Sequence, residues 1–67
     1  MGELIQRLVA EYRADQITWH DIQDQVEAYV LMQDGKGLNV TTTDIAKRFA
    51  KSNAILTKIE NLLKEGV

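Results

Sequence analysis

The sequence contains no proline, and its four glycines stand at positions 2, 35, 37 and 66. Proline and glycine are the residues that most often interrupt a helix or open a turn. Residues 35–37 are therefore the strongest internal interruption, and the chain on either side of them is free to form helices. We predict an all-α fold.

The length of 67 residues allows one domain, residues 1–67, with a thin core. A chain of this size buries only about 60% of the surface that it exposes when unfolded, and small domains often add disulfides or a bound metal. With no cysteine and a single histidine, this chain offers neither. Helix packing or self-association must stabilise it, and we expect no cofactor and no metal.

Apolar residues at helical spacing indicate the first two helices. Residues 3–14 form an amphipathic segment, which we interpret as an extra N-terminal helix. A second helix is predicted from a cap at Thr18, where Asp21 completes a capping box, to the helix-ending Gly35. The predicted buried positions of these helices are Leu4, Ile5, Leu8, Val9, Tyr12, Trp19, Ile22, Val26, Tyr29 and Val30.

Two further helices are predicted after a short extended connector. One begins at the cap Thr41, with Asp44 at the third helical position, and ends near residues 50–51. Ser52 then caps a last helix, which Gly66 ends. The inward stripe of this last helix is Ile55, Leu56, Ile59, Leu62 and Leu63. The prediction is therefore a small four-helix domain.

Residues 41–59 resemble the helix-turn-helix of the winged-helix family of bacterial and archaeal regulators. Ala46 stands where two steeply crossing helices need a small residue. The apolar contacts between those helices would come from Ile45, Phe49, Leu56 and Ile59. The sequence departs from the family at Ala50, where a glycine is common, and at Lys51, where an apolar residue is usual. The likeness covers residues 18–67 and implies a winged-helix-like core without the wing.

The resemblance implies sequence-specific binding of double-stranded DNA by a small transcriptional or replication regulator. The recognition helix would span about residues 53–65 and lie in the major groove. Contacts to base edges would come from Asn53, Thr57 and Lys58. Contacts to phosphates would come from Thr42, Thr43, Lys47, Lys51, Ser52 and Lys64. A homodimer formed through the first helix would present two recognition helices one DNA turn apart.

The charge distribution favours a DNA-binding second half, although the whole chain carries a net charge of −2. Residues 1–35 hold two basic and seven acidic side chains, which gives −5. Residues 36–67 hold six basic and three acidic side chains, which gives +3. A basic surface is the electrostatic signature of nucleic-acid binding, whereas scattered solvated charges are the ordinary alternative.

Two other classes of protein, an interaction module and an enzyme, are alternatives to a DNA-binding protein. The acidic first half and the missing wing favour a helical protein–protein interaction module on the same scaffold. We predict no enzyme and no small-molecule substrate, because the lone His20 has no nucleophile beside it in the pattern. Asp21, Asp24 and Glu27 share a helical flank, which is most simply a solvated face. With no run of about 18 apolar residues and no secretory signal, we expect a cytoplasmic protein that contacts no membrane.

Overall fold

The computed structural model describes residues 2–65, and within this range it contains three α-helices and no strand. They are α1 (Gly2–Arg13), α2 (Trp19–Asp34) and α3 (Thr42–Glu65). The all-α prediction is confirmed. The predicted helix end at Gly66 lies outside the described residues.

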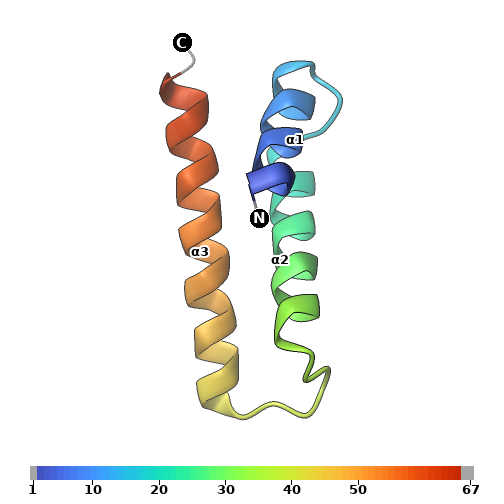
Figure 1. The fold of residues 1–67 in the computed structure, drawn as a ribbon, viewed down its shortest axis with the longest axis vertical. Helices are drawn as coiled ribbons and strands as arrows, with labels where there is room; N and C mark the ends of the chain where they lie inside the picture. Colours follow the sequence, from blue (N-terminus) through green and yellow to red (C-terminus); the bar gives the residue numbers. More distant parts are fainter. Residues whose placement is uncertain (1, 66–67) are drawn as a thin grey trace.

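The three helices form an elongated bundle of 40 × 19 × 19 Å. Helices α2 and α3 run antiparallel as a long hairpin, and α1 lies against the end of the hairpin that is remote from the α2–α3 loop (Figure 1). At 1.5 Å per residue, α1 with 12 residues is about 18 Å long, and α3 with 24 residues is about 36 Å long. The first helix therefore covers only about half of the hairpin.

Local signals in the sequence explain where α2 and α3 begin. The Thr18 hydroxyl accepts a hydrogen bond from the Asp21 amide at 3.2 Å, and the Asp21 carboxylate accepts one from the Thr18 amide at 2.9 Å. Thr41 and Asp44 make the same reciprocal pair at the start of α3, at 3.2 and 3.1 Å. Both predicted capping boxes are confirmed, and each satisfies amides that the first helical turn leaves unpaired.

The core lies between all three helices. Its buried apolar side chains are Ile5, Leu8, Val9, Ile22, Val26, Val30, Ile55 and Ile59. Three of these eight come from α1, so the N-terminal helix is part of the core. Arg7 and Arg13 attach α1 further, through a 2.8 Å hydrogen bond to the Gln25 side chain and a 3.0 Å hydrogen bond to the Leu62 carbonyl.

The predicted break at residues 50–51 is wrong, because α3 continues through these positions without interruption. The two helices expected from residue 41 to 65 are one helix, and the steep crossing of a helix-turn-helix is not formed within it. A left-handed turn built on Ala50 would cost about 1–2 kcal/mol, whereas alanine in a helix interior is the most favourable residue. Ser52 is not a cap, because its side chain is buried inside the hairpin.

Two smaller expectations are also decided by the structure. The connector of residues 36–40, expected to be extended, contains a turn in which the Asn39 amide donates a hydrogen bond to the Lys36 carbonyl at 3.1 Å. The apolar stripe of α1, expected to pack on the core or on a second subunit, packs on the hairpin of its own chain. Among the described residues, no helix is long and apolar enough to cross a membrane.

Candidate functional site

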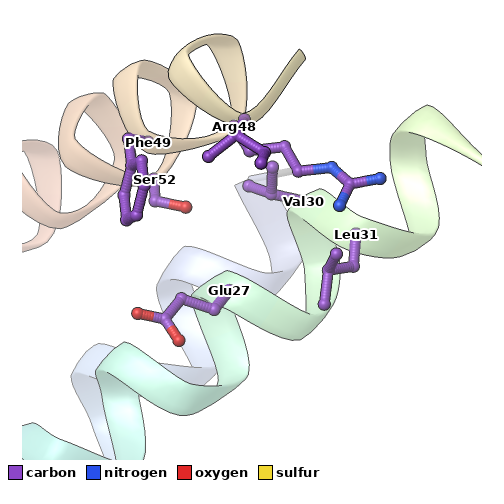
Figure 2. A pocket seen from close by; sticks show the side chains of 7 residues that line it. Glu27, Val30, Leu31, Arg48, Phe49 and Ser52 are labelled. Atoms are coloured by element: carbon purple, nitrogen blue, oxygen red, sulfur yellow. The ribbon is translucent and has the colours of Figure 1, made fainter. Parts of the chain in front are cut away.

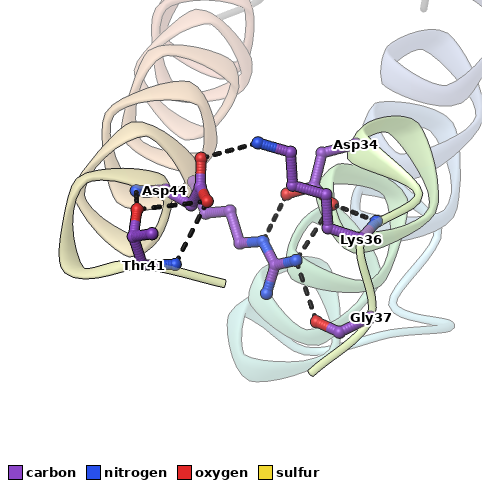
Figure 3. A network of polar contacts seen from close by, with 6 residues as sticks. Asp34, Lys36, Gly37, Thr41 and Asp44 are labelled. Carbon is purple, nitrogen blue, oxygen red and sulfur yellow. Dashed lines mark hydrogen bonds and ion pairs between the residues drawn. The ribbon is translucent and has the colours of Figure 1, made fainter. Parts of the chain in front are cut away.

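A polar cluster ties the two ends of the α2–α3 loop together (Figure 3). The Arg48 guanidinium pairs with the Asp34 carboxylate through two hydrogen bonds and also donates to the Gly37 carbonyl at 3.0 Å. The Lys36 ammonium lies 2.8 Å from the Asp44 carboxylate, which also caps α3. We call Asp34, Lys36, Asp44 and Arg48 the loop clamp, since these side chains connect α2, the loop and α3.

The clamp lowers the pKa of both of its carboxyl groups. For Asp34 the main cause is the Arg48 hydrogen bond, helped by the Lys36 amide, and the pKa falls from 3.8 to about 2. For Asp44 the main cause is the Lys36 side chain, helped by the Thr41 amide, and the pKa also falls from 3.8 to about 2. Both ionised carboxylates therefore accept hydrogen bonds in the folded protein that are lost in the unfolded chain.

We expect the free energy of unfolding to decrease as the pH falls from about 4 to about 2. A carboxyl group whose pKa is lower in the folded state stabilises the protein above its unfolded pKa and loses that effect as the pH falls through its folded pKa. Urea unfolding followed by circular dichroism from pH 5 downward measures this decrease. The Asp34→Asn variant should be less stable at neutral pH and show a shallower acid dependence. Equal stability of the wild type at pH 5 and pH 2 would contradict the expectation.

The outward surface of α3 carries most of the residues predicted to contact DNA. Those that are exposed are Thr42, Thr43, Lys47, Lys51, Asn53, Thr57, Lys58 and Lys64. Ser52 is the exception, because it is only 7% exposed and faces α2. Eight of the nine predicted side chains therefore remain accessible on one continuous helix, although the helix-turn-helix that was expected to present them is absent.

Three lysines of this surface share one side of α3. Lys47 and Lys51 are one turn apart, and Lys58 follows after seven residues, close to two further turns. Residues 45–59 hold four basic side chains and no acidic one. The small side chains of Ala50 and Ala54 lie between the lysines and let another molecule approach the helix backbone closely. We call Lys47, Lys51 and Lys58 the basic face. Asn53 and Thr57 are exposed on a neighbouring side of the same helix, about 100–140° around its axis from these lysines.

A second candidate site lies between α2 and α3 near the loop, and the sequence analysis did not predict it (Figure 2). We call it the hairpin groove. It is lined by Glu27, Val30, Leu31, Ile45, Arg48, Phe49 and Ser52. Figure 2 shows α1 behind α2 as seen from the groove, and no residue of α1 lines it.

The groove exposes three large apolar side chains, two of which, Ile45 and Phe49, the sequence analysis assigned to an interior. Phe49 is 63% exposed, Leu31 47% and Ile45 43%. Ile45 and Phe49 were expected to pack between two crossing helices. This prediction is wrong, because residues 42–65 form one continuous helix. One signal could have found the site: the apolar positions 45, 49 and 56 keep a helical spacing across the supposed turn, four and then seven residues apart.

Acidic side chains do not gather into a metal site in residues 2–65, where no group of three or more His, Asp or Glu residues could hold an ion. Asp24 lies 3.2 Å from the His20 ring nitrogen on the exposed flank of α2. No family model, no curated protein and no solved structure matches this chain. Functional inference therefore relies on the basic face and the hairpin groove.

Proposed function

We propose that the protein binds double-stranded DNA through the basic face of α3, as a small transcriptional or replication regulator. The observation that carries the proposal is the exposure of three lysines on one side of α3, in a segment of 15 residues without an acidic side chain. Lysines spaced along one helix can each reach a phosphate, and such contacts supply most of the affinity of DNA-binding proteins.

The shape of α3 supports the same proposal. A helix about 10–12 Å in diameter fits the major groove of B-DNA, which is about 12 Å wide. Asn53 and Thr57 are one turn apart and exposed. Their amide and hydroxyl groups can hydrogen-bond to base edges, which is the chemistry that sequence-specific binding needs. Ser52 takes no part in this proposal, because it is buried.

Salt dependence tests the proposal. Three lysine–phosphate contacts give a slope of about −2.7 for the logarithm of affinity against the logarithm of salt concentration. Raising the salt from about 50 to about 200 mM should then weaken binding to a fluorescent duplex about 40-fold. Binding is measured by fluorescence anisotropy with a duplex of random sequence.

A triple variant assigns the binding to the basic face. Lys47→Gln, Lys51→Gln and Lys58→Gln together should remove most of the affinity and most of the salt slope. Lys64→Gln is the matched control. The sequence analysis assigned Lys64 to a phosphate, but it lies beside Tyr12, Trp19 and Glu60, about 120° around α3 from Lys58 and therefore off the basic face. It should change the affinity less than about threefold. If the wild type does not bind duplex DNA even at low salt, the proposal is contradicted.

The alternative function, a helical module that binds another protein, is favoured by the hairpin groove. Exposed apolar side chains in one place commonly mark protein contacts. The groove and the basic face share no residue. The triple lysine variant therefore separates the two functions, because it should abolish DNA binding and leave binding at the groove intact.

A further inference from the structure

We infer that the hairpin groove is the contact surface between two copies of this chain, which pack hairpin against hairpin about a twofold axis. The inference concerns a different surface from the basic face, and it does not depend on DNA binding. It rests on three properties of the groove: its exposed apolar side chains, the size of the face around it and its charge.

The first property is a shape that is complementary to itself. The Phe49 ring, 63% exposed, stands beside a hollow whose floor is Val30 and Ser52, and both of these residues are buried. Under a twofold axis, the Phe49 side chain of each copy enters the hollow of the other, as knobs enter holes in helix bundles. The two Phe49 side chains then lie side by side next to the axis.

The second property is the area of the long face that carries the groove. The bundle measures 40 × 19 Å overall, so a face along its long axis offers at most about 760 Å², against the roughly 800 Å² per partner of a standard interface. A second hairpin matches this area. A single peptide helix, about 10 Å wide, would cover only about half of it.

The third property is the low charge of the groove lining. It contains one carboxylate, Glu27, and one guanidinium, Arg48. Arg48 is paired with Asp34 in the loop clamp, so Glu27 is the main uncompensated charge of the lining. Two identical surfaces with a high net charge repel each other across a twofold axis, and one carboxylate at the edge of an apolar lining adds little repulsion. The packing completes a four-helix bundle from two hairpins, and the basic face of each copy stays exposed.

The mass of the full chain in solution tests the inference. Sedimentation equilibrium of the wild type should give twice the chain mass of 7.6 kDa, in a concentration-dependent equilibrium. Phe49→Glu should raise the dissociation constant of the dimer about 100-fold, because it buries a charge at the centre of the contact. Met32→Glu is the matched control, since Met32 is 83% exposed and lies outside the groove. It should change the constant less than about threefold.

A second measurement keeps the test decisive if Phe49→Glu perturbs folding. The natural chain has no cysteine, so one introduced cysteine reports one position. Phe49→Cys should form a disulfide-linked dimer under mild oxidation, and Met32→Cys should not. A wild type that keeps the monomer mass up to about 1 mM overturns the inference. Equal loss of the dimer in Phe49→Glu and Met32→Glu, or disulfide formation at position 32 alone, overturns it too.

Discussion

Replacing Ala50 with proline is expected to destabilise the protein by at least about 3 kcal/mol. Ala50 lies near the middle of α3, where its amide belongs to the helical hydrogen-bond pattern. Proline removes that amide hydrogen, and its ring collides with the carbonyl of Ala46 one turn earlier. Domains of this size are stable by roughly 3–10 kcal/mol, so the variant should lose much or all of its folded population. Thermal unfolding followed by circular dichroism measures the loss.

The matched control for this variant is Thr42→Pro. Thr42 is the first residue of α3, where a proline is tolerated because the amide has no partner within the helix. The Ala50→Gly variant tests the direction of the change in stability. It should cost about 1 kcal/mol in a continuous helix, and it would stabilise a left-handed turn. A stable Ala50→Pro variant, or a stabilising Ala50→Gly, would contradict a continuous α3 and restore the helix-turn-helix.

Replacing Leu8 with alanine is expected to lower the free energy of unfolding by about 3–4 kcal/mol. The Leu8 side chain is fully buried, and it is the least exposed of the three that α1 contributes to the core. Its truncation removes apolar contacts and leaves a cavity that two straight helices cannot easily close. Chemical denaturation by urea measures the change.

The same truncation at Leu38 is the control. Leu38 lies in the α2–α3 loop and is 99% exposed, so Leu38→Ala should change the stability by less than about 0.5 kcal/mol. A small effect at Leu8 would mean that α1 is an accessory of the hairpin and that the core is formed by α2 and α3 alone. The two variants together measure how far this short chain depends on its N-terminal helix.

The two proposed surfaces divide α3 between them. Lys47 and Lys51 are on the basic face, whereas Ile45 and Phe49 line the groove. Because these sets occupy different sides of one helix, a dimer formed at the groove presents two basic faces, each on a rigid helix. Paired faces of this kind are what a regulator needs for tight binding to DNA, because a single helix makes few contacts.

The sequence alone was sufficient for the local features of the fold. Thr18 with Asp21 and Thr41 with Asp44 mark the starts of α2 and α3, because a capping box is made by residues three positions apart. Gly35, with φ of +64°, ends α2 in the left-handed conformation that glycine adopts most easily. Most of the buried positions of α1 and α2 follow from helical periodicity in the same local way. Tyr12 of α1 and Leu62 of α3, predicted to face inward, are each 37% exposed and lie at the edge of the core.

The tertiary structure decided the course of α3. A serine followed by an apolar stripe is compatible with a new helix at Ser52 and equally with a helix that continues through it, since a serine hydroxyl can serve as a cap or remain inside a helix. Packing chooses between them: one straight α3 keeps Ile55 and Ile59 buried against α2 along the hairpin.

The same packing decided which apolar residues face solvent. The periodicity of the sequence determined that Ile45 and Phe49 share a side of a helix, but periodicity does not say whether another element covers that side. Helix α1 is half the length of α3 and lines no part of the hairpin groove, so Ile45 and Phe49 stay exposed. Coverage depends on the lengths and positions of neighbouring helices, and these are set by contacts between residues far apart in the chain.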